Sequence, residues 1–556
     1  MPLQETTGNI SADAYGGGTA VTPVYVEDVM STFLYTGNGS TQTITNGIDL
    51  ATYGGMVWAK SRSLAKDNSV FDTVRGVQKS LVTNLAVSQY DDSGGGPTAG
   101  LYAFNSNGFS LGPNYMSEIN TSGATEVSWT FRKQAKFFDV ITWTGNGTTN
   151  RTISHALGVA PAVVITKSTS ASGSWNYCCG FDTTGFTLLY LNSTAAGSAK
   201  LYSDDVVMDA QPTSTTITVG TNANSNGVTY VAYLFAHNAG GFGLTGTDNV
   251  ISCGSFTVDG SGNASVNLGY EPQWILTKEK VTSGSANWQI IDTMRGWTSN
   301  LGYSYLKPNS SAAEGSTTTP YYSVNATGFA CTGNTGSGTV IYIAIRRGPM
   351  KVPTDGTKVF VPVASSAAQY TQLTTNFPVD AQLYAIRTSA QTYNSLMTTR
   401  LTGVSTTDAD QAGPYLITSG TAAEASSYAN SRNWNNTGYG ITSSFGGDSN
   451  IWWNFRRAPG FFDEVCYTGN DADPRAINHN LSVAPEMMIV KARTNSDSVA
   501  THWFVYHKGL NGGTNPQNYY ILLDGNDTSN PSAAIWSNTA PTSSVFTVAY
   551  NRGVNL

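Results

Sequence analysis

The sequence predicts an all-β protein in which five tandem antiparallel β-sandwich domains of the jelly-roll type follow a short extended N-terminal arm. One phrase, an apolar run that ends at a basic residue, recurs about every 105 residues, and a stretch of that length is enough for a self-sufficient domain. The clearest segments are short, rich in Val, Ile, Tyr, Trp and Thr, and bounded by Gly, Asn, Ser and Pro, which is typical of strands. No long segment has the apolar spacing of an amphipathic helix.

The recurring phrase marks one strand in each domain. It occurs as residues 55–60, 162–167, 273–278, 382–387 and 486–491, and the basic residues are Lys60, Lys167, Lys278, Arg387 and Lys491. Several of these runs are apolar without interruption, so we expect a central strand that is covered on both faces. We expect each basic residue to end that strand at the rim of the sheet, with its stem packed on apolar neighbours and its charge in water. Five equal ligand sites are the alternative.

Turn signals precede the phrase in four of the five copies and keep the same period. They lie at residues 36–39, 144–147, 259–262 and 468–471, where Asn-Gly and Asp-Gly pairs supply the positive φ of tight turns. Short polar strands follow the first two turns, at residues 42–46 and 151–155. Copy four lacks the turn and has Arg instead of Lys. The predicted domains are 29–135, 136–240, 241–350, 351–460 and 461–556.

Two further features distinguish individual copies. Copies one and three contain Asp72-Thr-Val-Arg75 and Asp292-Thr-Met-Arg295, which we expect to form internal ion-paired turns. Copies one to four close on an apolar strand, at residues 127–133, 230–236, 341–347 and 451–457. Copy five stops after residues 545–550 and lacks its last strand, which exposes a sheet edge. Either a partner strand fills this gap or the natural chain continues past Leu556, and we favour the second reading.

Residues 1–28 belong to no repeat and form the predicted arm. Gly16-Gly17-Gly18 is flexible, whereas Val24–Val29 has the composition of an edge strand. The arm is either a disordered tail or a segment that becomes ordered by docking on a neighbouring subunit. We favour docking because the arm has no run of charges, and we predict that residues 1–28 attach the chain to another protein.

Composition excludes several classes of protein. Charged residues make up only 12% of the chain, hydrophobic residues 40%, and the net charge is −7, so we expect a folded protein that binds no nucleic acid. No apolar run is long enough to span a membrane, and the N-terminus lacks the basic and apolar segments of a secretory signal. Five cysteines with no C-x-x-C spacing indicate buried free thiols in a reducing cytoplasm. A protein made in a host cytoplasm and used in a virus particle fits this profile.

The search for chemistry gives no catalytic, cofactor or metal residue, and the ligand-binding residues are unknown. His155 and His479 hold the same repeat position and are interpreted as surface turn residues. His502 and His507 lie five apart on one strand, so they face opposite sides and cannot share a metal. The acidic pairs Asp408/Asp410 and Asp471/Asp473 lack the remainder of a calcium loop. No paired glutamates of a sandwich glycanase and no nucleophile elbow are present.

Several motifs resemble tandem domains in structural and tail proteins of tailed bacteriophages, especially marine ones. These are the opening Thr-Gly-Asn-Gly turns, the turns at residues 157–161 and 481–485, the segment 540–546 and the N-terminal residues 1–18. The unit is similar to concanavalin A-like (laminin G-like) sandwiches. The resemblance implies a non-enzymatic tail fibre or tail-associated protein that docks through residues 1–28 on other virion proteins of the tail or baseplate. It also implies a homo-oligomer, with a trimer as one arrangement, whose domains contact host-surface glycans. A capsid or tail decoration protein is the main alternative, and a glycan depolymerase is less favoured.

Overall fold

The computed structural model describes most of the chain and is all-β. The described residues are 22–280, 286–299, 302–333, 338–348, 350–365, 372–387, 394–403, 413–427, 432–441, 450–494, 501–526, 528–550 and 553–555. Within these ranges the strands pair antiparallel, and the α-helices are the single turns α2 (Val26–Val29) and α3 (Leu50–Tyr53). None of the described helices could cross a membrane. The predicted fold class is confirmed.

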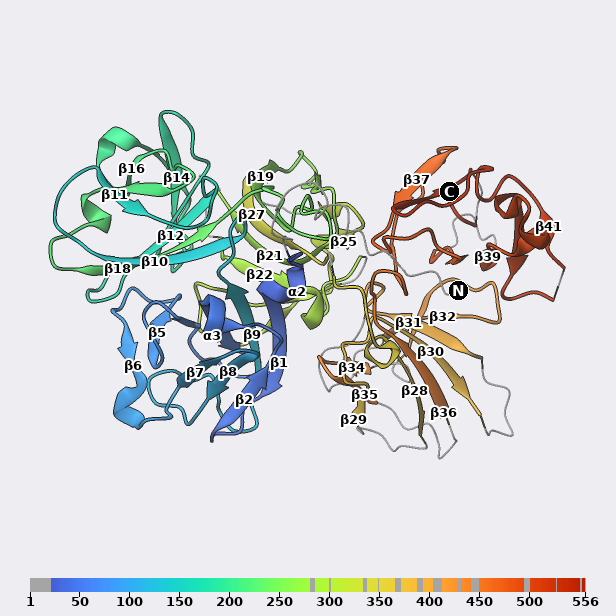
Figure 1. Ribbon diagram of the computed structural model, residues 1–556, viewed down its shortest axis with the longest axis horizontal. Coiled ribbons are helices and arrows are strands. Elements are labelled where there is room, and N and C mark those ends of the chain that lie inside the picture. Colours follow the sequence, from blue (N-terminus) through green and yellow to red (C-terminus); the bar gives the residue numbers. More distant parts are fainter. Residues whose placement is uncertain are drawn as a thin grey trace, which may run out of the picture.

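We name the segments 29–135, 136–240, 241–350, 351–460 and 461–556 units one to five (Figure 1). Each contains one larger and one smaller sheet. In unit one the spatial order of the larger sheet is β1 (Met30–Thr36), β9 (Thr125–Arg132), β3 (Gly55–Ser61), β4 (Ser69–Asp72), β5 (Lys79–Val82) and β6 (Tyr90–Asp91). The smaller sheet contains β2 (Gln42–Thr45), β8 (Gly108–Leu111) and β7 (Leu101–Asn105).

Units two and three repeat this topology. The larger sheet of unit two contains β10 (Phe138–Thr144), β18 (Thr229–Phe235), β12 (Val163–Ser168), β13 (Asn176–Cys179), β14 (Gly185–Tyr190) and β15 (Ser198–Leu201), and the smaller contains β11 (Arg151–Ser154), β17 (Thr216–Val219) and β16 (Met208–Ala210). Unit three has β19 (Ile251–Thr257), β27 (Thr339–Arg346), β21 (Pro272–Glu279) and β22 (Gln289–Asp292) in one sheet, β20 (Ala264–Asn267), β26 (Gly328–Cys331) and β25 (Tyr322–Asn325) in the other, and the ribbon β23 (Ser304–Tyr305) with β24 (Gly315–Ser316).

Units four and five follow the same order, with one difference. Unit four has β28 (Phe360–Ser365), β36 (Asn450–Phe455), β30 (Ala381–Ile386), β31 (Leu396–Thr399), β32 (Gly413–Ile417) and β33 (Ala425–Ser427), opposite β29 (Gln372–Thr374), β35 (Gly438–Ile441) and β34 (Arg432–Trp434). Unit five has β38 (Met487–Val490), β39 (Phe504–His507), β40 (Tyr519–Leu522) and β41 (Asn530–Pro531), with β37 (Arg475–Asn478) and β42 (Val545–Val548). We call β9, β18, β27 and β36 the closing strands; the described part of unit five has no strand at that place.

The central strand of unit one is buried on both faces, as its uninterrupted apolar run predicts. Val57 and Ala59 point into the sandwich of unit one. Met56 and Trp58 point the other way, into a second core that continues through units two and three. Hence the outer faces of the larger sheets of units one to three bury one another.

Aromatic side chains hold this shared core together. Phe131 of β9 makes edge-to-face contacts with Phe235 of β18, at 5.9 Å between ring centroids, and with Trp274 of β21, at 5.8 Å. These three residues come from units one, two and three. A single ring that contacts both neighbouring units places Phe131 near the middle of a three-unit assembly.

The predicted Gly-Asn turns are present and are closed by a recurring asparagine. In unit two, Asn224 Nδ2 donates to Thr148 O at 2.7 Å, and its Oδ1 accepts from Asn146 N at 3.1 Å. Asn120 plays the same part in unit one and Asn555 in unit five. Glycine is required because a Cβ on Gly145 would lie 2.0 Å from the carbonyl oxygen of Ser225.

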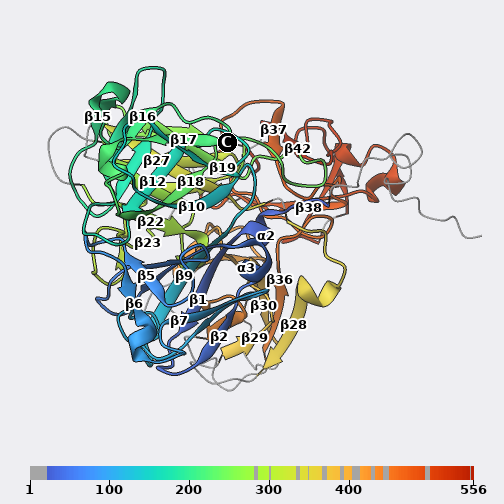
Figure 2. The same ribbon diagram turned by 60° about the vertical axis from the view of Figure 1, so that its left-hand side comes forward.

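The end of the N-terminal arm is built into the body. Residues 26–29 form α2 rather than the expected edge strand, and Val26 and Val29 are buried in the shared core. Val24 O accepts from Gly243 N at 2.9 Å, and Glu27 accepts from the backbone N of Lys351 at 2.9 Å. Figure 2 shows α2 where the first three units meet the last two. Residues 1–21 of the predicted arm lie outside the described residues.

Candidate functional site

Three of the four recurring lysines are buried, which corrects the expectation that their charges lie in water. Lys60 and Lys167 are 0% exposed and Lys278 is 1% exposed. Burial lowers the pKa of each of these three ammonium groups to about 8. A buried ammonium requires hydrogen-bond acceptors, and here backbone carbonyls supply them.

Three of these lysines bind the backbone of a neighbouring unit. Lys60 Nζ donates to Ser311 O of unit three at 3.1 Å, Lys278 Nζ to Thr194 O of unit two at 2.9 Å, and Lys491 Nζ to Thr421 O of unit four at 3.2 Å. Lys167 instead donates within unit two, to Ser168 O at 2.8 Å. The recurring lysine is therefore chiefly a residue of unit-to-unit interfaces and not a set of five equal ligand sites.

The strand register also corrects the assignment of Arg387. Met56 faces Phe131 across the sheet of unit one, and Ala381 faces Phe455 in unit four. Lys60 is four residues after Met56, so its counterpart four residues after Ala381 is Ala385. Arg387 therefore corresponds to Arg62. The same position holds Lys280 in unit three and Arg493 in unit five.

A second recurring contact joins the same units. In each of these units, one residue lies directly before the strand that pairs with the central strand, and its side-chain N–H donates to a backbone carbonyl of the neighbouring unit. The four bonds are Trp175 Nε1 to Val82 O at 2.8 Å, Trp288 Nε1 to Tyr190 O at 3.0 Å, Asn68 Nδ2 to Lys307 O at 3.2 Å and Trp503 Nε1 to Ile417 O at 2.9 Å. We call the part of a unit that contains this residue and the basic residues its donor side. The accepting carbonyl and the residues four and seven positions after it form the acceptor side.

These contacts close units one to three into a ring. The donor side of unit two contacts the acceptor side of unit one, and the donor side of unit three contacts the acceptor side of unit two. The donor side of unit one contacts the acceptor side of unit three, which closes the ring. The residues seven positions after the accepting carbonyl add backbone contacts, from Gln89 N to Thr169 O and from Glu314 N to Arg62 O, each at 2.8 Å. Sequence reasoning missed these donors, although the three tryptophans lie eight to twelve residues after a recurring lysine.

The two predicted ion-paired turns are confirmed, and both also contact another unit. Arg75 Nε lies 2.6 Å from Asp72 Oδ2, which also accepts from Tyr233 OH of unit two at 2.7 Å. In unit three, Arg295 Nε lies 2.7 Å from Asp292 Oδ2, which accepts from Trp129 Nε1 of unit one at 3.0 Å. Both turns therefore lie inside unit-to-unit interfaces.

Glu314 joins one of these turns to unit one. Its carboxylate contacts Arg295 at 3.0 Å and Arg62 of unit one at 2.7 Å. Burial alone would raise the pKa of Glu314, but the two guanidinium groups outweigh it and lower the pKa. The carboxylate is thus held ionised between two arginines, which is a structural role.

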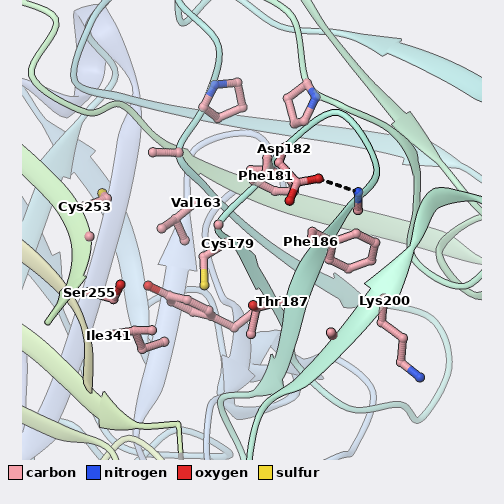
Figure 3. Close-up of a pocket in the computed structure, with 18 of the residues that line it drawn as sticks. Val163, Cys179, Phe181, Asp182, Phe186, Thr187, Lys200, Cys253, Ser255 and Ile341 are labelled. Carbon is pink, nitrogen blue, oxygen red and sulfur yellow. Dashed lines mark hydrogen bonds between the residues drawn. The ribbon is translucent and has the colours of Figure 1, made fainter. Parts of the chain in front are cut away.

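Unit two lacks the ion-paired turn, and a cavity of about 670 Å³ lies at this place. The counterpart of Asp72 and Asp292 in unit two is Cys179. Cys179 faces Val163 of the central strand, just as Asp72 faces Met56 and Asp292 faces Trp274. Cys179, Phe181 and Phe186 line the cavity from unit two, and Cys253, Ser255 and Ile341 line it from unit three (Figure 3). The volume is that of an ordinary ligand pocket.

The polar groups of the cavity favour binding over covalent chemistry. Burial raises the pKa of Cys179 to about 12 and raises that of Cys253 further, so both remain thiols at neutral pH. Burial lowers the pKa of His237, whose Nδ1 accepts from Cys253 N at 3.1 Å. Lys280 Nζ donates to Thr187 Oγ1 at 3.0 Å. The cavity combines an aromatic wall with hydroxyl, carboxylate and amine groups at its rim.

The other candidate residues are dispersed. His155 and His479 are turn residues, and both ring nitrogens of each contact backbone atoms. His502 lies 3.1 Å from Asp524, whereas His507 accepts from Gly509 N. Asp473 accepts from Ser537 Oγ, and Asp408 and Asp410 lie outside the described residues. In the ranges that the structure describes, His, Cys, Asp and Glu form no group of three with the geometry of a metal site, and the five cysteines are free thiols.

Comparison with known proteins gives one relationship. No curated protein matches the chain. A family model described as a domain of unknown function, DUF7483, matches residues 26–349 and residues 368–556. The first matched stretch covers the three units of the closed ring, and the second covers most of units four and five. The chain therefore belongs to the DUF7483 family.

Proposed function

We propose that this protein is a structural component of a bacteriophage virion, a tail fibre or tail-associated protein whose sandwich units contact the host surface. The observation that carries this proposal is the closed ring of three like sandwiches around a shared core. Such a ring presents the exposed faces of three similar smaller sheets at fixed distances. Weak contacts made by repeated faces add up to strong attachment when they act together.

The N-terminal arm is the proposed attachment segment. Its last residues are fixed between the units, because Val26 and Val29 are buried and Asp28 accepts from Tyr25 N at 2.9 Å. Residues 1–21 are joined to the body at this fixed point. This arrangement suits a segment that docks on a tail or baseplate protein and transmits force to a rigid body.

The cavity between units two and three is the proposed place for a host glycan. Phe181 and Phe186 provide an aromatic surface of the kind on which sugar rings stack, and Asp182 and Thr184 provide polar groups beside it. Asp182 Oδ1 already accepts from the backbone N of Thr184 and Gly185, so the loop that carries these groups is preorganised.

Deletion of residues 1–21 tests the attachment role. Deletion of residues 1–28 would be a poor test because it removes Val26 from the shared core. We expect the shorter deletion to leave the thermal unfolding midpoint within about 2 °C of the parent, because no residue of the ring is lost. Virions assembled with this variant should lack the protein. Normal incorporation would contradict the arm assignment.

Binding of the purified chain to host cells and to a glycan array tests the receptor role. We expect binding that falls at least tenfold in Phe186→Ala, with Phe461→Ala, an exposed aromatic far from the cavity, as the matched control. Absence of binding by the parent chain, together with normal adsorption of virions that lack it, would favour the alternative function of decoration or shielding.

A further inference from the structure

Units four and five contact each other through the same interface that closes the ring of units one to three. Trp503 Nε1 donates to Ile417 O, and Lys491 Nζ donates to Thr421 O, four residues further on. Arg493 contacts Glu424, seven residues after Ile417, at 2.7 Å. Arg62 contacts Glu314 across the interface of units one and three in the same register. Units four and five are therefore placed relative to each other like two successive units of the closed ring.

A ring of three such units needs three interfaces, and the described residues of units four and five form one of them. The donor side of unit five and the acceptor side of unit four are used in it. The donor side of unit four and the acceptor side of unit five face the remaining place. In the first ring every donor side and every acceptor side is covered.

The free side of unit four is apolar and more exposed than its counterpart in the closed ring. Ile451, Trp453 and Phe455 of β36 are half-buried. The residues at the same register positions of β9, which are Val127, Trp129 and Phe131, are each 0% exposed. Arg387, the counterpart of Arg62 and Arg493, is exposed.

The free side of unit five shows the same change. Met487 and Ile489 are 51% and 43% exposed, whereas their counterparts Val163 and Ile165 in unit two are buried. Leu523, which follows the accepting carbonyl position, is 44% exposed, and its counterpart Leu191 is 1% exposed. Large apolar side chains at ring positions are thus left uncovered on both sides of the same place.

We propose that the place between units four and five binds one more sandwich unit of this repeat, which completes a second ring. The occupant has a carboxylate seven residues after its own accepting carbonyl, and this carboxylate pairs with Arg387. Glu314 and Glu424 hold this position in units three and four, where they pair with Arg62 and Arg493. It also presents a side-chain N–H to the carbonyl of Leu522, the counterpart of Tyr190. A strand joined to this unit lies along β38 as the closing strand.

A second copy of the whole chain does not fit this place. Its first three units have both sides covered, and each of its last two units has one side covered. Only a unit with both sides free can contact unit four and unit five at once. The chemistry that recognises the place therefore belongs to a single unpaired repeat.

The test adds such a unit to the complete chain. Asn555 occupies the position of Asn224, so fusion of a copy of residues 226–348 after Leu556 supplies a closing strand and a copy of unit three in register. We expect hydrogen exchange of residues 451–455 and 520–523 to slow at least tenfold. A shorter fusion of residues 226–238 supplies only the closing strand and should slow exchange of residues 487–490 alone.

Charge reversal shows whether the protection comes from the proposed contact. In the extended chain, Arg387→Glu should remove most of the protection of residues 451–455, whereas the conservative Arg387→Lys should retain most of it. In the parent chain Arg387→Glu should change nothing, because this side chain is exposed there. A second extension with residues 122–240 appends a copy of unit two, which has Gly197 and no carboxylate at the position of Glu314. It should protect the apolar residues without sensitivity to Arg387. The proposal is overturned if neither long extension slows exchange of residues 451–455 and 520–523, or if Arg387→Glu leaves the first extension unchanged.

Discussion

The first three units and the last two are built from the same repeat, yet their interfaces are used to different extents. In units one to three the outer face of each larger sheet is covered by its neighbours, and a single core runs through all three. In units four and five the corresponding strands β36 and β38 are half-buried or exposed on that face. The same sequence pattern thus produces an interior residue or a surface residue according to whether the neighbouring unit is present.

The largest expected difference is between Trp129 and Trp453, which hold the same position in units one and four. Trp129 is fully buried, lies 5.9 Å from Trp58 and donates to Asp292. We expect Trp129→Ala to cost about 3–5 kcal/mol and Trp453→Ala about 1 kcal/mol, because only the first leaves a cavity in a closed core. Urea denaturation followed by near-ultraviolet circular dichroism measures both. Equal losses would contradict the distinction between a closed and an open ring.

The next difference concerns two glutamates that pair with an arginine of a neighbouring unit. Glu314 lies between Arg62 and Arg295, and all three side chains are at most 8% exposed. Glu424 pairs with Arg493, whose side chain is 19% exposed. We expect Glu314→Gln to cost about 2–4 kcal/mol, because two buried guanidinium groups lose their counter-charge, and Glu424→Gln to cost about 1 kcal/mol or less. Thermal unfolding of both variants at the same ionic strength provides the measurement.

The sequence predicted the repeats, the strand class and the ion-paired turns because each depends on local pattern. The strands at residues 42–46 and 151–155 and the turns at Asp72 and Asp292 lie where alternation, glycine and charge spacing place them. These features are formed by residues that are near one another in the chain, so periodicity and turn chemistry suffice to find them.

The ring was not predictable because its acceptors are backbone carbonyls. The apolar runs that end at Lys60 and Lys278 predict a strand end at the sheet rim, with the stem of each lysine on apolar neighbours and its charge in water. In the structure their partners are the carbonyls of Ser311 and Thr194, which any residue type would supply. Sequence spacing pairs Arg387 with Lys60 for a related reason: the distance from unit to unit varies, and only strand pairing identifies Ala385 as the counterpart of Lys60.

The pH dependence of stability should distinguish a lysine of the closed ring from one of the open pair. Burial, and then the charge of Arg75, lower the pKa of Lys167 to about 8, whereas unfolded lysine titrates near 10.4. Between these values the unfolded chain holds more protons than the folded one, so Lys167 adds stability as the pH rises from 8 to about 10.4. The free energy of unfolding of the parent should therefore rise by about 2 kcal/mol relative to that of Lys167→Met over this pH window. Lys491, which is half-buried, serves as the matched control through Lys491→Met, and an equal pH slope in the two variants would count against the argument.

The smallest expected difference lies within the closed ring, between its filled and hollow interfaces. Val140 and Cys253 hold the same position in β10 and β19, facing Tyr233 and Ile343 across their sheets. Val140 is fully buried, whereas Cys253 lines the cavity between units two and three. We expect Val140→Phe to cost about 1–3 kcal/mol through overpacking and Cys253→Phe less than about 1 kcal/mol, because the added ring enters free volume. Urea midpoints of the two variants measure this. A loss at Cys253 as large as that at Val140 would mean that the cavity wall cannot accept a larger side chain, and the cavity would then be too rigid or too narrow beside Ile341 for a sugar ring to enter.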